Sequence, residues 1–298
     1  MLTLILGRGK SGKTSMLLEA VRTCPAMGMA QRIVIVPEQL SHQTERKLSA
    51  VCGDGISFVS EVLSFTRLQN RVSSIYGGGA RKSLDKGGRI LTAKLALSAV
   101  HSQLKVFAAA SGRADFLGSM VSTVDELKSY SIGEKQLLEA SQNTEGLLSQ
   151  KLLELSVILG AYNAVMAQGT CDPRDKLELL RRQLMETDYA SARHFFVDGF
   201  TDYSTQELGI LDALLRRGAH LTVTVPCDPE NRNPFGPGEE TVARLIRLAS
   251  SAGASVEVLR AAHRRRLPEA LTYLEQHLFS YDAPPCSVDA HGISLTVA

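Results

Sequence analysis

The feature that most constrains this chain is the octapeptide GRGKSGKT at residues 7–14, which follows the apolar run Leu2–Leu6 and precedes the amphipathic segment SMLLEAVRT. It matches G-x-x-x-x-G-K-[ST] in the order of strand, glycine loop and helix that a phosphate-binding loop requires. The glycines let the backbone turn its N–H groups toward phosphate oxygens, and the following helix adds the positive end of its dipole. A chance glycine loop is the alternative, but the flanking strand and helix argue against it. We therefore predict a nucleotide-binding loop made of Gly7, Arg8, Gly9, Lys10, Ser11, Gly12, Lys13 and Thr14.

Specific side chains of this loop and of a second motif are expected to hold Mg-ATP. Lys13 would reach the β- and γ-phosphates, and Thr14 would ligate Mg²⁺. The apolar run FFVD at residues 195–198 supplies the acid that such a site needs on a neighbouring parallel strand. Asp198 stands at the carboxyl end of this run, where ligands of open α/β sheets bind, and it is predicted to hold Mg²⁺ through the water shell of the ion. The alternative is that Asp198 only caps the next turn.

The residue after Asp198 bears on hydrolysis. A hydrolase must orient and deprotonate a water molecule in line with the γ-phosphate, and helicase-type enzymes with this loop use a Glu directly after the acid. Here that position is Gly199, which has no side chain. Asp202 and Glu207 are the nearest downstream carboxylates, and the offset from the strand end directs Asp202 elsewhere. The sequence therefore predicts binding of Mg-ATP with weak or lost hydrolysis, and no catalytic residue.

Apolar runs alternate with helical segments near both ends of the chain, which predicts an α/β fold with a parallel sheet flanked by helices. Proline or glycine stops several of these elements, as Pro37, Gly218, Pro226 and Gly253 do. After the first strand, the predicted strands lie in RIVIVPEQ (32–39), GISFVSEVL (55–63), FFVD (195–198), HLTVTVP (220–226), VEVL (256–259) and ISLTV (293–297).

Between about residues 80 and 188 only helical periodicity is found. One helix is predicted to pack through the stripe Leu148, Leu152, Leu155, Leu159, Tyr162 and Val165, and the helix before it through Phe116, Met120, Val121, Val124 and Leu127. Asp172-Pro173 is predicted to start a further helix as its cap and first-turn proline. We therefore predict a discontinuous α/β domain, residues 1–80 and 189–298, interrupted by an all-helical insertion, residues 81–188.

The junction between the third predicted strand and its helix carries Ser64, Thr66 and Arg67. It falls at the same sheet edge as the phosphate-binding loop, where a translocating nucleoside triphosphatase touches its polymer. The three residues are therefore candidate DNA contacts. The alternative is that Ser64 and Thr66 only cap the helix.

Composition excludes several classes of protein. With Lys+Arg 33 against Asp+Glu 31, the net charge is only +2, so any nucleic-acid surface must be local. Five cysteines occur without a C-x-x-C pair, which favours a reducing compartment and no metal site made by them. The sequence has no targeting segment and no run of roughly 18 apolar residues. We expect a soluble, cytoplasmic protein that makes no membrane contact, and a piece of a longer one because the chain stops within a predicted strand.

Taken in order, the phosphate-binding loop, VPEQ, VLSFTRL, the helical insertion and FFVDGFTDYSTQE resemble the N-terminal portion of the AddB (RexB) family. This family comprises the B subunits of bacterial AddAB-type ATP-dependent helicase/deoxyribonucleases. The resemblance spans nearly the whole chain and implies a superfamily 1 helicase-like domain. It places the nucleotide loop at Gly7–Thr14, the magnesium-binding acid at Asp198, and Gly199 where active helicases carry Glu.

The resemblance also implies partners and a cellular role. The parent complex would be an ATP-dependent helicase/exodeoxyribonuclease of double-strand break repair and recombination, with an AddA-type helicase-nuclease as the motor. The helicase-like half of the AddB-type protein would recognise a recombination hotspot in single-stranded DNA without unwinding it. The iron–sulfur cluster of the family would lie in the C-terminal part, outside this chain. Two alternatives remain open at this point: an autonomous enzyme such as a small-molecule kinase, and a relic loop that binds no nucleotide.

Overall fold

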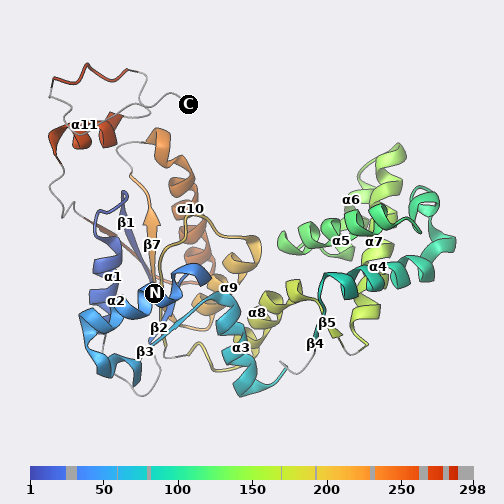
Figure 1. The fold of residues 1–298 in the computed structure, drawn as a ribbon, viewed down its shortest axis with the longest axis horizontal. Coiled ribbons are helices and arrows are strands. Elements are labelled where there is room, and N and C mark those ends of the chain that lie inside the picture. Colours follow the sequence, from blue (N-terminus) through green and yellow to red (C-terminus); the bar gives the residue numbers. More distant parts are fainter. Residues whose placement is uncertain are drawn as a thin grey trace. The chain divides into compact units, whose positions relative to one another are not determined.

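A computed structural model describes residues 1–24, 32–58, 60–78, 82–168, 170–191, 193–228, 232–261, 268–277 and 282–287 (Figure 1). The predicted strand ISLTV, at residues 293–297, lies outside the described residues. Within the described part of the chain, no helix combines the length and the apolar character needed to cross a lipid bilayer.

The structure is an α/β fold, as the sequence predicts, built on a six-stranded sheet with the order β3-β2-β6-β7-β1-β8. Every strand pair is parallel. The inner strands are short and apolar because a parallel sheet is covered on both faces. The strands are β1 (Leu2–Gly7), β2 (Arg32–Ile35), β3 (Ser60–Leu63), β6 (His194–Val197), β7 (His220–Pro226) and β8 (Val256–Arg260).

Helices cover the sheet on both sides, and Figure 1 draws α1 and α2 on one side of the strands and α10 on the other. On the first side, Leu17 and Leu18 of α1 and Leu48 of α2 pack with Ile5 of β1 and Val34 of β2 in one buried cluster. The helices and 3₁₀ turns around the sheet are α1 (Lys13–Thr23), η1 (Glu38–Leu40), α2 (Ser41–Cys52), η2 (Asp54–Phe58), α10 (Arg232–Ser251) and α11 (Glu269–His277).

The chain divides into two compact units. We call the first the sheet unit; it comprises Met1–Ser64, Ala190–Asp202 and Leu214–Ala298. The second, the helical unit, comprises Phe65–Tyr189 and Tyr203–Ala213, so it includes most of α9 (Thr205–Arg216). The predicted domain boundaries at residues 80 and 189 stay a prediction.

The helical unit contains α3 (Phe65–Tyr76), α4 (Lys86–Val100), η3 (His101–Gln103), η4 (Ala108–Ala110), α5 (Ala114–Ser129), α6 (Glu134–Gln142), α7 (Gly146–Met166), η5 (Pro173–Asp175) and α8 (Lys176–Glu186). Two short strands, β4 (Lys82–Ser83) and β5 (Thr170–Cys171), pair in parallel, so the prediction of helices alone was wrong there.

The core of the helical unit confirms one predicted stripe and most of the other. Met120, Val121 and Val124 of α5 are buried, as predicted. On α7 Leu159 and Tyr162 are buried and Leu152 and Leu155 pack against the same cluster, but Leu148 is 56% exposed. The segment LLSQKLLELSVIL is apolar on several faces, so its spacing alone does not show where the buried stripe begins. Also, α6 lies between α5 and α7, so the two striped helices do not follow each other directly.

Candidate nucleotide-binding site

The loop at residues 7–14 joins the carboxyl end of β1 to the start of α1. Two of its residues have positive φ: Gly12 at 95°, directly before the helix, and Lys10 at 58°. A Cβ atom at Gly7 would lie 2.3 Å from Ser11 Oγ, so only glycine lets the loop close in this way. The sequence pattern therefore requires glycine at positions 7 and 12 for two different reasons, close approach and left-handed backbone.

Lys13 lies folded against its own loop. Its Nζ donates to the carbonyl oxygens of Gly7, at 2.7 Å, and of Arg8, at 2.6 Å. Burial lowers the pKa of Lys13 from its usual value, although the Asp198 carboxylate acts in the opposite direction. A half-buried ammonium group that binds carbonyls in the bend of the loop can exchange them for phosphate oxygens, which are stronger acceptors.

Asp198 contacts the loop although it lies 184 residues after Thr14 in the sequence. Thr14 Oγ1 donates a hydrogen bond of 2.8 Å to Asp198 Oδ2. The side chain of Asp198 is buried, and its second oxygen, Oδ1, accepts a hydrogen bond of 2.5 Å from Thr224 Oγ1 of β7. The strand that carries Asp198 is not the neighbour of β1, contrary to expectation, because β7 lies between them. Asp198 thus lies at the carboxyl edge of the sheet on the phosphate-loop side, bound to two threonines instead of capping a turn.

The residues of this edge fit a phosphate group and Mg²⁺ chemically. Ser11 is only 3% exposed, and among the described residues its Oγ has no hydrogen-bond partner. An unsatisfied buried hydroxyl is costly unless a ligand completes its bonding. Thr14 and Asp198 offer a hydroxyl and a carboxylate oxygen at one place, and Mg²⁺ prefers a few such protein oxygens together with phosphates and water. The donor set therefore suits a Mg-phosphate ligand.

Gly199 does more than omit a carboxylate, because its backbone conformation and its neighbours also favour glycine at this position. Its φ is +83°, and a Cβ atom there would lie 2.7 Å from Leu40 Cδ1 and 3.3 Å from Pro37 Cδ. The chain thus turns left-handed immediately after Asp198, and the Pro37–Leu40 segment occupies the space of a side chain. Asp202 is exposed and faces Arg244 at 3.8 Å, so it does not replace the missing acid. Glu207 accepts a hydrogen bond from the Ser204 backbone N–H at the start of α9, at 2.8 Å.

The three candidate DNA contacts are not equivalent. Ser64 is buried at the end of β3 and donates its hydroxyl hydrogen to the Glu38 carboxylate, which joins the VPEQ and SFTRL motifs. Thr66 and Arg67 are exposed in the first turn of α3 and belong to the helical unit. Exposure leaves only Thr66 and Arg67 of the three accessible to a polymer.

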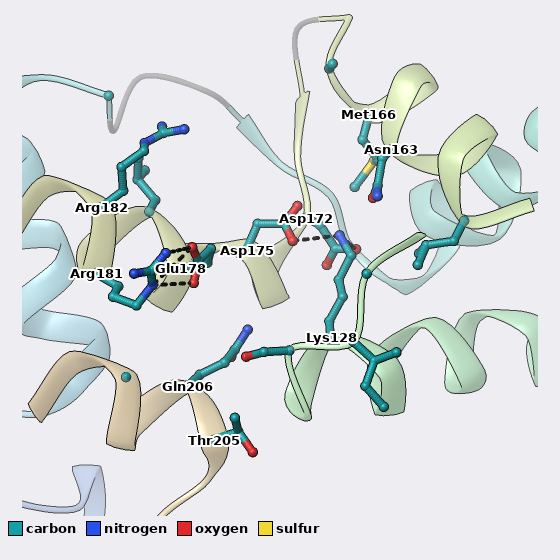
Figure 2. Close-up of a pocket in the computed structure, with 18 residues that line it drawn as sticks. Lys128, Asn163, Met166, Asp172, Asp175, Glu178, Arg181, Arg182, Thr205 and Gln206 are labelled. Carbon is teal, nitrogen blue, oxygen red and sulfur yellow. Dashed lines mark hydrogen bonds and ion pairs between the residues drawn. The ribbon is translucent and has the colours of Figure 1, made fainter. Parts of the chain in front are cut away.

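A separate cavity of about 880 Å³ lies wholly within the helical unit. Figure 2 shows Lys128 beside Asp175, and Arg181 beside Glu178, with the paired groups pointing toward each other. The buried carboxylate of Asp172 also accepts from Lys128, at 3.2 Å. Arg182 also lines the cavity, so three cations face three carboxylates and the lining has no net charge that would favour an anion.

Asp172 fulfils its predicted role and has a second one. Its side chain accepts from the Arg174 backbone N–H, as the cap of the turn that begins with Pro173. It is also fully buried and bound by Tyr162, at 3.1 Å, and by Arg89, at 3.4 Å. The Asp-Pro pair signals the cap, but no local pattern signals the contacts with distant helices.

Sequence reasoning missed two residues at the sheet edge. Thr224 binds Asp198, and Asp228, just beyond β7, forms an ion pair with Arg8. A threonine in the alternating strand HLTVTVP is an ordinary strand residue by propensity, so nothing local distinguishes Thr224. Only the position of β7 between β1 and β6 reveals both roles.

Comparison with known proteins identifies the family of this chain. A family model described as "ADDB, N-terminal" matches residues 4–275. The B subunits of ATP-dependent helicase/deoxyribonucleases from several bacteria are similar along most of the chain. That of Moorella thermoacetica is 34% identical over 317 residues (100% of this chain, 28% of the relative), that of Pelotomaculum thermopropionicum 31% over 312 (99% and 27%), and that of Desulforudis audaxviator 34% over 295 (93% and 25%). The chain thus spans 28% or less of the length of these relatives.

Proposed function

Because this chain belongs to the AddB N-terminal family, we propose that it is the nucleotide-binding, helicase-like part of an AddB-type component of an ATP-dependent helicase/deoxyribonuclease. In this proposal the loop Gly7–Thr14 binds the phosphates of ATP, and Thr14 and Asp198 hold Mg²⁺. Hydrolysis is weak or lost. The observation that carries the proposal is the contact between Thr14 and Asp198, which joins the two motifs at one sheet edge.

The geometry around Gly199 supports the loss of hydrolysis. Bound Mg²⁺ would supply charge neutralisation at the phosphates, but a water molecule must also be activated. Gly199 supplies no carboxylate at the position after Asp198, and its left-handed backbone, with Leu40 packed against it, disfavours any residue that has a side chain. The neighbouring acid Asp202 lies at the Arg244 side chain instead.

The test is a calorimetric titration of Mg-ATP into the 298-residue chain and into a Lys13→Gln variant. Loss of charge-assisted hydrogen bonds to phosphate should weaken binding by about 10-fold or more, since each is worth about 1.5–3 kcal/mol. Lys47→Gln, which removes an exposed lysine of α2 in the same unit, is the matched control and should bind like the parent. Absence of Mg-ATP binding, or equal affinity in Lys13→Gln, contradicts the proposal and favours a relic loop.

Phosphate release in the same samples separates the proposal from the alternative of a small-molecule kinase. The proposal predicts bound ATP with negligible turnover, with or without small hydroxyl or amine acceptors. Turnover that depends on such an acceptor would favour the kinase.

We also propose that the chain assembles with an AddA-type motor protein and contacts single-stranded DNA through Thr66 and Arg67 during double-strand break repair and recombination. Their exposure supports this role. Arg67→Ala should weaken binding of a fluorescent single strand across sequences and reduce the salt slope by about one unit. Arg71→Ala, on the same helix, is the control. Equal losses of affinity in Arg67→Ala and Arg71→Ala would contradict a specific DNA contact by Arg67.

A further inference from the structure

Arg8, in the phosphate-binding loop, forms an ion pair with a carboxylate far from the loop in sequence. Its guanidinium group pairs with Asp228, and both side chains are mostly buried, with 17% and 16% exposure. Its Nη1 also donates to the carbonyl oxygen of Glu275 in the last turn of α11, at 3.4 Å. The C-terminal end of a helix favours a cation, so α11 offers a second anchor for the same group.

The backbone of Arg8 lies where the phosphates of a nucleotide would be bound. Its carbonyl oxygen accepts the hydrogen bond from Lys13 Nζ. The same carbonyl accepts from the Ser11 backbone N–H across the bend of the loop, at a long 3.4 Å. The anchored side chain of Arg8 therefore fixes a carbonyl that positions Lys13.

The strand β7 touches both halves of the site. Thr224 of β7 binds Asp198, and Asp228, two residues beyond the end of β7, binds Arg8. Because β7 lies between β6 and β1, one segment sets the positions of the metal-binding acid and of the phosphate loop.

The loop needs external anchors because its own conformation is not a low-energy one. Lys10 has a φ of 58°, which a residue with a side chain rarely adopts. A loop held in such a conformation by few internal bonds is populated only if surrounding contacts maintain it. Any loss of that population lowers the apparent affinity for nucleotide by the same factor.

We propose that Asp228 is a positioning residue of the nucleotide site, which acts through Arg8 to keep the phosphate-binding loop in its binding conformation. The inference rests on the proposed binding of Mg-ATP. The anchoring role also predicts a change in nucleotide affinity opposite in direction to the change expected from charge alone. Removal of a carboxylate near bound phosphates should strengthen binding by charge alone, whereas loss of the anchor should weaken it.

The test is a double-mutant cycle of Arg8→Met and Asp228→Asn, read out by Mg-ATP titration. Positioning predicts that each single variant binds about 3- to 10-fold more weakly and that the double variant is no weaker than the weaker single variant. If Asp228 acted only through its charge, Asp228→Asn would bind Mg-ATP more tightly and the double variant would bind it nearly as the parental chain does. That result would overturn the proposal. Asp202→Asn, which removes an exposed ion pair beyond β6, is the matched control and should leave affinity unchanged.

Hydrogen exchange of the nucleotide-free protein gives a second, independent readout. In Asp228→Asn the amides of residues 8–12 should exchange several-fold faster, while those of α1 and β7 keep their parental rates. Unchanged exchange in the loop would refute the anchoring role. If the parental chain binds no Mg-ATP, the proposed function fails, and the exchange rates still decide whether Asp228 positions the loop.

Discussion

Gly199 provides a prediction about stability that can be worked out from its surroundings. The change is Gly199→Ala, which adds one Cβ atom to a residue at φ +83°. A left-handed backbone costs a residue with a side chain about 1–2 kcal/mol. The new atom would also meet Leu40 Cδ1 at 2.7 Å. That atom is the end of a flexible side chain, so the additional cost of overpacking should be about 1–2 kcal/mol.

Gly253 separates the two contributions. It belongs to the same unit and has a φ of +67°, but a Cβ atom there would meet nothing within 4 Å. Gly253→Ala should therefore lower the free energy of unfolding only by the cost of a left-handed backbone, about 1–2 kcal/mol. Gly199→Ala adds the cost of overpacking and should lower it by about 2–4 kcal/mol. Urea unfolding followed by circular dichroism measures both, and the difference should shrink when Leu40→Ala is combined with Gly199→Ala. If Gly199→Ala costs no more than Gly253→Ala, the packing argument is wrong.

Three other substitutions have expected outcomes. Glu154 is buried and accepts from three backbone N–H groups of residues 105–107; although burial opposes its charge, these bonds hold its pKa below the usual value. Glu154→Gln should cost about 1–3 kcal/mol in urea unfolding at pH 7, and the parental stability should fall as the pH drops below about 4.3. Burial, and then the charges of His220 and Arg32, lower the pKa of His194. The free energy of unfolding should therefore keep its full value above about pH 6.5 and fall below that pH, because the folded protein resists protonation of this ring. In His220→Asn the fall should be smaller. Asp172→Ala leaves buried cations without their shared carboxylate and should lower the free energy of unfolding by about 3 kcal/mol, measured by the same method.

The strand–loop–helix at the start of the chain, the strands of the six-stranded sheet and the position of Asp198 beside Thr14 could be predicted because each depends on a local pattern. Glycines at fixed spacing, a short apolar run and a terminal acid are sufficient to indicate a phosphate-binding loop and its partner strand. The order of the strands could not be predicted, because sequence alone does not state that β7 lies between β1 and β6. Thr224 and Asp228 take their roles from that order and were therefore missed.

Gly199 shows a second limit of the sequence. The absence of a carboxylate can be predicted from the residue type alone. The left-handed turn and the contact with Leu40 depend on how residues 37–40 pack, which no pattern near Gly199 indicates. A variant Gly199→Glu is therefore expected to strain the fold as well as to add an acid, so it should be made together with Leu40→Ala.

Helix α7 shows the same limit in the helical unit. Its leucines correctly predict a helix and most of its packed stripe, but Leu148 of that stripe is exposed. Glu154, a charged residue, lies in the core because the backbone N–H groups of residues 105–107 bind its carboxylate. This partner segment is almost fifty residues away in sequence.

Binding of ATP without hydrolysis is tested by a single-turnover measurement with Mg-ATP labelled on the γ-phosphate and protein in excess. We predict that ATP is retained on the parental chain, is not retained by Lys13→Gln, and is recovered intact after many minutes. Release of labelled phosphate within seconds, or loss of retention in both proteins alike, would contradict it.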